Sequence, residues 1–261
     1  VFSRMLQHNR QLLWAHASGR PDLGGLENDE VEITAGIEEE QHFTPTISVP
    51  GAYRKICIDI EVMALAVNSI MAQPCLEELE GAQMLDLGGQ RSGDGAAGAH
   101  TFKILRLLVS QWLAEASMNG NEIADAMLMH FYRWLCAAES KLYDPALHQM
   151  VHQLMTKVFL RLVAELRRLG AHVVYASFNR ILIATQKTDV ASAQEYVSFV
   201  VETITAMPVF SILQLNASKY WEQLIFMDGE NFGGIEVGLA GDAAEPRAEA
   251  AESVEGDGDD G

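Results

Sequence analysis

The sequence predicts an α+β fold, in which helices pack on one face of an antiparallel sheet. Between about residues 145 and 227 the patterns follow the order helix, hairpin, helix, strands, which favours a layer of this type. A long apolar stripe at helical spacing precedes the hairpin. Nearly all of the excess negative charge lies outside these elements, so the body that folds is close to neutral.

The clearest helix is predicted over residues 145–169. Asp144 is a suitable N-cap, and Pro145 suits the first helical position. Gly170 is a suitable C-cap after a basic last turn. The stripe consists of apolar residues at positions three or four apart: Leu147, Val151, Leu154, Met155, Val158, Leu162, Leu166 and Leu169.

Two short strands are predicted after this helix, at 172–176 and 180–185, with a tight turn near Phe178-Asn179. Asp189 is expected to cap a helix that Pro208 ends. A β-rich stretch at 209–227 follows.

The first half of the chain has weaker signals. A strand is predicted at 53–59, with Ile56, Ile58 and Ile60 on one face. We expect helices at 62–71, at 101–117 with Thr101 as the cap, and at 122–138.

Charge and composition divide the chain. Residues 27–40 carry −7 and residues 236–261 carry −8 of the net charge of −18. We therefore expect one folded module over residues 1–235, with flexible insertions at about 19–50 and 77–99 and an acidic, disordered tail at 236–261. The low isoelectric point argues against an independent DNA-binding protein.

The three cysteines, Cys57, Cys75 and Cys136, form no closely spaced pair, so no zinc site is predicted. Their number and spacing are typical of a reducing compartment. No apolar run approaches the roughly 18 residues of a membrane span, so no membrane contact is expected. A first residue other than Met suggests a piece of a longer chain.

Several rare words of this sequence resemble the C-terminal, non-catalytic half of the DNA polymerase epsilon catalytic subunits, which are B-family DNA polymerases. The matches are collinear from about residue 7 to 235. They are RQLLW (10–14), RPDLGG (20–25), HFYRWL (130–135), KLYDPALH (141–148), FNRILIATQK (178–187) and MDGENFGGI (227–235).

The resemblance implies a degenerate, palm-like polymerase module that organises the replicative holoenzyme in the nucleus. Its partners would be the second subunit of that holoenzyme and the replicative helicase complex, with weak DNA contact at most. The parent chain would be a DNA-directed DNA polymerase with a proofreading exonuclease. That parent would use Mg²⁺, and its cysteine motifs outside this segment would hold zinc and an iron–sulfur cluster.

The residues themselves support an inactive site. A B-family palm holds its metal pair with one carboxylate at a strand end and others at a hairpin tip. In the hairpin Tyr175–Asn179, Ser177 and Asn179 occupy the acidic positions, and neither side chain is an anionic ligand. Asp59 or Glu61 would occupy the other position. We therefore predict no catalytic, cofactor-binding or metal-binding residue here, and treat Ser177, Asn179 and Asp59 as vestigial.

Phe178 at the hairpin tip is expected to put an apolar ring where water and metal would lie. The segment also lacks the fingers signature, a helical Lys followed by Asn-Ser-x-Tyr-Gly. The alternatives are a divergent active nucleotidyltransferase, a DNA-binding palm domain, or an unrelated acidic α+β domain.

Two other groups have the pattern of a site. Arg161, Arg167 and Arg168 form a basic cluster that is a possible interaction surface. His148 and His152 have the spacing of a zinc helix, but no Glu follows the first of them, so a role at the edge of the core is favoured.

Overall fold

A computed structural model describes residues 1–11, 44–80, 94–137 and 143–237. The strands are β1 (Ile47–Ser48), β2 (Gly51–Tyr53), β3 (Cys57–Met63), β4 (His172–Ala176), β5 (Arg180–Ala184), β6 (Gln214–Phe226) and β7 (Phe232–Glu236). The helices are α1 (Phe2–His8), α3 (Leu65–Glu80), α4 (Asp94–Asn119), α5 (Glu122–Met129), α6 (Phe131–Leu135), α7 (Pro145–Arg168) and α8 (Val190–Thr205), with a 3₁₀ turn at Pro208–Phe210.

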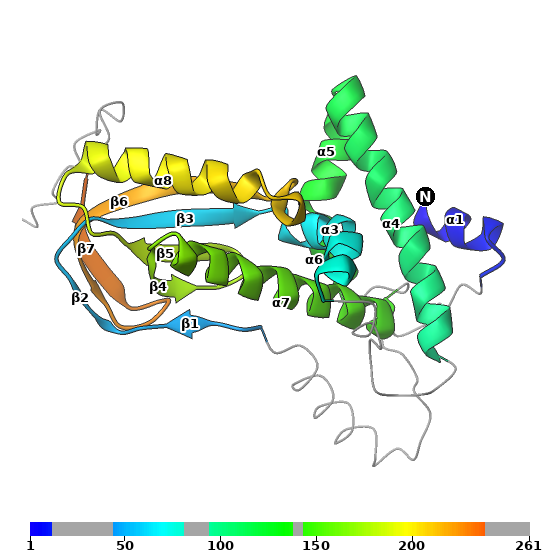
Figure 1. Cartoon of the computed structure of the whole chain (residues 1–261). Helices are drawn as coiled ribbons and strands as arrows, with labels where there is room; N and C mark the ends of the chain where they lie inside the picture. The colour runs from blue at the N-terminus through cyan, green and yellow to red at the C-terminus, as the bar shows by residue number, and fades with distance from the viewer. Residues whose placement is uncertain (12–43, 81–93, 138–142, 238–261) are drawn as a thin grey trace, which may run out of the picture.

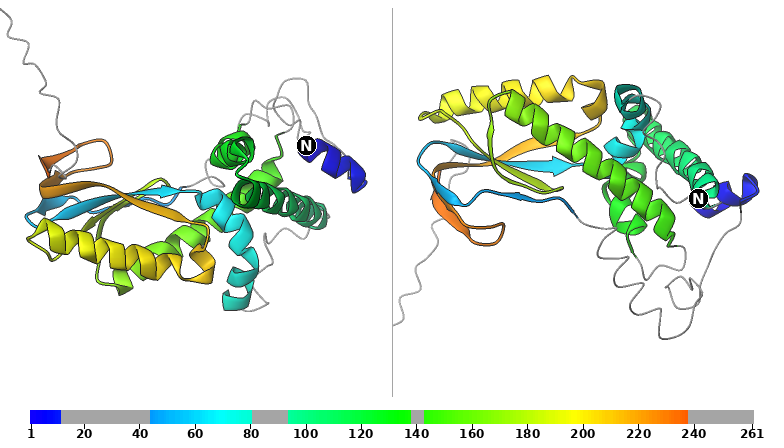
Figure 2. Two further views of the ribbon diagram at one scale, coloured as in Figure 1. Left: turned by 90° about the horizontal axis from the view of Figure 1, so that it is seen from above. Right: turned by 60° about the horizontal axis from the view of Figure 1, so that its bottom comes forward.

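The strands form one curled antiparallel sheet in the order β1-β4-β5-β3-β6-β2, and β7 pairs with the other edge of β6. Helices α7 and α8 cover one face of this sheet (Figure 1). The remaining helices gather at one end of the sheet, where α1 lies beside α4 in both orientations (Figure 2). The predicted α+β class and antiparallel sheet are confirmed.

The two faces of the sheet bury separate apolar clusters. Ile58 and Ile60 of β3 belong to the large core beneath the helices. Because side chains alternate along a strand, Cys57, Asp59 and Glu61 face the opposite side. There Cys57 packs with Leu182, Trp221 and other residues of a smaller cluster, over which β7 curls.

The long helix α7 agrees closely with its prediction. The Asp144 carboxylate accepts a hydrogen bond from the Leu147 amide at 3.1 Å, and Pro145 is the first helical residue. Gly170 has a φ of +89°, the left-handed conformation expected after a helix C-terminus. The hairpin at 172–184 and the Asp189 cap of α8 are also confirmed.

Several predicted boundaries in the first half are wrong. Strand β3 runs on to Met63, so α3 begins at Leu65, and it then continues through Pro74 to Glu80. Helix α4 begins at Asp94, so Thr101 lies inside it and is not its cap. The helix predicted over 122–138 is divided at His130 into α5 and α6.

The predicted insertions include regular secondary structure at their ends. Strand β1 lies within 19–50, and helical residues occupy 77–80 and 94–99. The rest of these insertions, at 19–43 and 81–93, and the tail beyond 237 lie outside the described residues, so those predictions stay untested.

Truncating Leu162 to Ala is expected to destabilise the fold by about 2–5 kcal/mol, because the side chain is fully buried and its loss leaves a cavity. Denaturant unfolding measures the change. Leu160 is the matched control, since it is 50% exposed on the same helix and its truncation should cost less than about 0.5 kcal/mol. Equal losses for both variants would show that the buried face of α7 is misassigned.

The Cys57 thiol is expected to resist alkylation until the protein unfolds. Burial excludes reagent and raises the pKa of Cys57 to about 12, so the folded thiol stays protonated at pH 8 to 10. Mass spectrometry after iodoacetamide treatment would locate the label. The more accessible Cys75 provides the internal comparison, and modification of Cys57 at the rate of Cys75 would contradict this burial.

Candidate functional site

The β4–β5 hairpin brings the vestigial positions next to β3. Its turn is closed by two hydrogen bonds to the Arg180 carbonyl, from the Ser177 amide at 2.8 Å and from the Ser177 hydroxyl at 3.3 Å. Asn179 is exposed. Strand β5 then pairs with β3, which puts Leu182 opposite Asp59 and Arg180 opposite Glu61. The hairpin and Asp59 are therefore neighbours, as the sequence pattern predicts.

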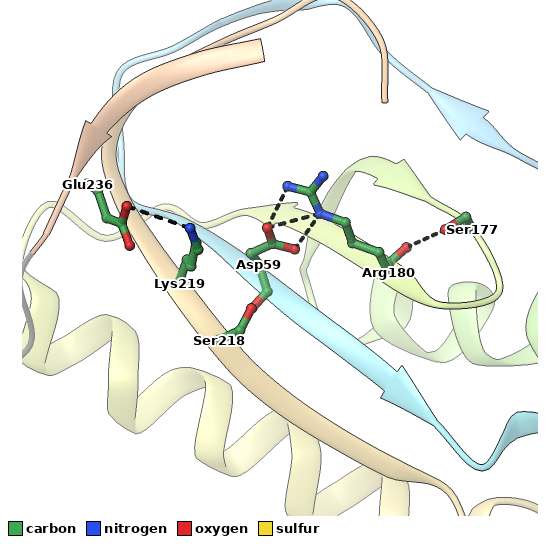
Figure 3. Close-up of polar contacts among 6 residues, drawn as sticks. All are labelled: Asp59, Ser177, Arg180, Ser218, Lys219 and Glu236. Carbon is green, nitrogen blue, oxygen red and sulfur yellow. Dashed lines mark hydrogen bonds and ion pairs between the residues drawn. The ribbon is translucent and has the colours of Figure 1, made fainter. Parts of the chain in front are cut away.

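An ion pair between Asp59 and Arg180 occupies the centre of this site (Figure 3). The Arg180 Nε lies 2.8 and 2.9 Å from the two Asp59 oxygens, and Nη2 lies 2.5 Å from Oδ2. Arg180 is diagonal to Asp59 across the β3–β5 pair, so both side chains lie on the same face. The hydrogen bond to Asp59 raises the pKa of Arg180, and the guanidinium stays charged at any physiological pH.

Aromatic and polar side chains surround this pair. The Phe232 ring of β7 lies 4.4 Å from the guanidinium carbon of Arg180, within range of a cation–π interaction. The Ser218 hydroxyl donates to the Asp59 carbonyl at 3.3 Å (Figure 3). Lys219 contacts Glu236 at 3.8 Å, but both side chains are about half exposed, so this contact adds little.

A groove of about 670 Å³ opens over the ion pair on the face away from α7 and α8. It is lined by Asp59, Glu61, Val62, Met63, Asn179, Arg180, Ser218, Lys219, Trp221 and Phe232. Within the part of the chain that the structure describes, the buried Trp221 indole Nε1 has no hydrogen-bond partner. Two acids and two bases face each other in this lining, so the groove has no strong net charge.

This arrangement does not supply the ligands of a divalent metal pair. Both oxygens of Asp59 already accept hydrogen bonds from a guanidinium, and the turn offers a hydroxyl and an amide. Metal ions of this kind need several convergent oxygens that carry negative charge. Among the described residues, no three His, Cys, Asp or Glu side chains are grouped so that they could hold a metal ion.

The interpretation of Phe178 needs correction. Its ring does not point toward the groove but is buried under the sheet, where it packs against His152 and Phe159 of α7 with ring centroids 5.4 Å apart in both cases. The physical reason is that Phe178 lies in the turn between β4 and β5, where strand alternation does not apply, so its ring reaches the helix side while Arg180, the first residue of β5, faces the groove.

His148 and His152 are buried in a network of tyrosines. The Tyr132 hydroxyl lies 3.0 Å from Nδ1 of His152 and 3.4 Å from Nε2 of His148, and Tyr143 lies 3.1 Å from Nδ1 of His148. These contacts join the segment before α7 and the short helix α6 to α7. They support a structural role at the edge of the core.

The three arginines of α7 are exposed but do not form one patch. Arg161 and Arg168 are seven residues apart and share a side of the helix, whereas Arg167 lies on a different side. Arg168 is also paired with Glu165 at 2.6 Å.

Sequence reasoning missed Arg180, which is the residue that decides the chemistry of the site. A signal was present, since Arg180 lies two residues before buried Leu182 and so must share its face of the sheet. Phe232 could not be found in this way, because β7 reaches the groove only through the curl of the sheet.

No helix within the described ranges is long and apolar enough to cross a membrane.

Comparisons with known proteins define the class of this chain. A family model described as "Domain of unknown function (DUF1744)" matches residues 1–235. Similar curated proteins are the DNA polymerase epsilon catalytic subunits of Emericella nidulans, 38% identical over 89% of this chain, and of Schizosaccharomyces pombe, 35% identical over 90%. One of the corresponding catalytic subunits from Arabidopsis thaliana is 35% identical over 89%.

The chain therefore belongs to the DUF1744 family. It corresponds to a segment in the C-terminal region of DNA polymerase epsilon catalytic subunits, and it spans only 11% of the length of each of these three relatives. The family resemblance predicted from the sequence is confirmed.

Replacing Arg180 with Met is expected to destabilise the fold by about 3–5 kcal/mol, because it leaves the Asp59 carboxylate buried without a cation. The double variant Asp59→Leu/Arg180→Met should recover most of this loss, since it removes both charges. Denaturant unfolding of the two single variants and the double variant forms a complete cycle. Additive losses across the cycle would show that the pair is not coupled.

Proposed function

We propose that this chain is a non-catalytic, palm-like module of a DNA polymerase epsilon catalytic subunit, with a structural role in the replicative holoenzyme. The similarity to DNA polymerase epsilon catalytic subunits supports the proposal that this chain is part of a polypeptide that works in DNA replication.

The order of elements supports a palm-like description. Strand β3 is followed by a helix, α3, and the long helix α7 is followed directly by the β4–β5 hairpin. Because β3 and β5 are paired, the strand and the hairpin tip that would carry metal-binding carboxylates in an active B-family palm lie side by side. This is the arrangement that the sequence motifs predict.

The single observation that carries the non-catalytic role is the bidentate contact of Arg180 with Asp59. The guanidinium provides the positive charge that a metal ion would otherwise provide to this carboxylate, and it comes from the hairpin itself. A guanidinium that belongs to the chain cannot coordinate the oxygens of a triphosphate as a metal ion does, and it cannot leave with the product. The ion pair then stabilises the sheet.

A structural module of this kind acts through its surface. By family resemblance, the partners are the second subunit of the holoenzyme and the replicative helicase complex, in the nucleus. Of the exposed arginines Arg161, Arg167 and Arg168 of α7, the two that share a side of the helix, Arg161 and Arg168, are proposed as a contact region for such a partner.

The proposal predicts that this segment contributes no nucleotide incorporation. The test uses the full-length polypeptide with the polymerase site outside this segment inactivated, in a primer-extension assay with Mg²⁺ and deoxynucleotides. We expect no template-directed incorporation above a protein-free reaction, because Ser177 and Asn179 cannot hold the metal pair. The matched variant is Ser177→Ala/Asn179→Ala. Incorporation that this variant abolishes would overturn the proposal.

A further inference from the structure

An apolar stripe runs along the outer side of α5 and α6. It consists of Ile123, Met127 and Trp134, whose exposed fractions are 75%, 46% and 37%. The two helices are nearly continuous, since the His130 amide donates to the Ala126 carbonyl and the Trp134 amide to the His130 carbonyl, both at 3.1 Å. Spacings of four and seven residues place the three side chains on one side of this combined helix.

The stripe is extended by Met118 at the end of α4, which is 84% exposed. Helices α4 and α5 pack against each other as a hairpin, and Met118 is four residues before the start of α5. Neighbouring large apolar side chains with this exposure mark a surface that another element covers. Their helical spacing suits the apolar face of a second helix.

One end of the stripe is already covered by the beginning of this chain. The Phe2 ring of α1 meets Trp134 edge-on, with centroids 5.8 Å apart and an interplanar angle of 87°. Val1 is 76% exposed, and the N-terminal end of α1 is the end nearest α4 (Figures 1 and 2). A chain that enters at Val1 therefore arrives next to Trp134, at the covered end of the stripe.

We propose that the stretch of the full-length polypeptide immediately before Val1 packs its apolar face along Met127 and Ile123. This inference rests on the proposed function, because it places the segment inside a longer polymerase chain, of which it spans 11% in its relatives. Covalent connection at Val1 gives this stretch a high effective concentration at the stripe, which favours it over any separate protein. The α4–α5 hairpin then anchors this module to the part of the polypeptide that precedes it.

Site-specific photo-crosslinking in the full-length polypeptide tests this inference. Benzoylphenylalanine replaces Met127 in one variant and Glu195 in a control, since Glu195 is exposed on the distant helix α8. After irradiation and digestion, mass spectrometry identifies the peptides that are joined. We expect the Met127 probe to capture a peptide from the stretch before Val1, and at least tenfold more of it than the Glu195 probe.

Each other outcome would overturn the inference. Capture of residues 12–43 or of another part of the chain would give the stripe a different internal occupant, and capture of a separate polypeptide would make it a partner surface. A probe that joins nothing would show that the stripe stays uncovered. None of these results bears on nucleotide incorporation, so the primer-extension assay distinguishes failure of this inference from failure of the proposed function.

Discussion

Burial of the Asp59 carboxylate on the groove face of the sheet is the constraint from which the rest of the site follows. Removing an ionised carboxylate from water costs several kcal/mol, so the fold must supply a cation and hydrogen bonds for it. Arg180 can do this because the β3–β5 register places it diagonally across from Asp59 on the same face. Phe232 and Trp221 border the pair and reduce its access to water.

The β3–β5 register depends in turn on how the opposite face of the sheet packs against the helices. The buried stripe of α7 packs against the strands, and Phe178 in the hairpin turn packs against Phe159 and His152 of that helix. Arg180 begins β5 two residues before Leu182 and so shares its groove face. One side of the hairpin is therefore used for packing and the other for charge neutralisation, which leaves no convergent set of anionic ligands at the turn.

Elements with strong local signals were predictable. Helix α7 has a capping carboxylate, a proline at its first position and a glycine after its end, and each of these acts within a few residues of the chain. The predicted helix boundaries were wrong where a Gly/Ala-rich stretch or a single proline was taken as the limit of a helix. Helix α4 begins in the Gly/Ala-rich stretch at 94–99, where alanine prolongs a helix that has already formed, and α3 continues through Pro74 while it packs against α7.

By itself, the sequence determined the α+β class, the family, the position of the hairpin and the absence of carboxylates at Ser177 and Asn179, because these depend on residue type and local spacing. Only the tertiary structure decided what becomes of Asp59. Its partner Arg180 is 121 residues away, and the aromatic ring over that partner belongs to β7, which follows it by a further 52 residues. Contacts at such separations depend on strand register and on the curl of the sheet, which are properties of the packed fold and not of any local segment.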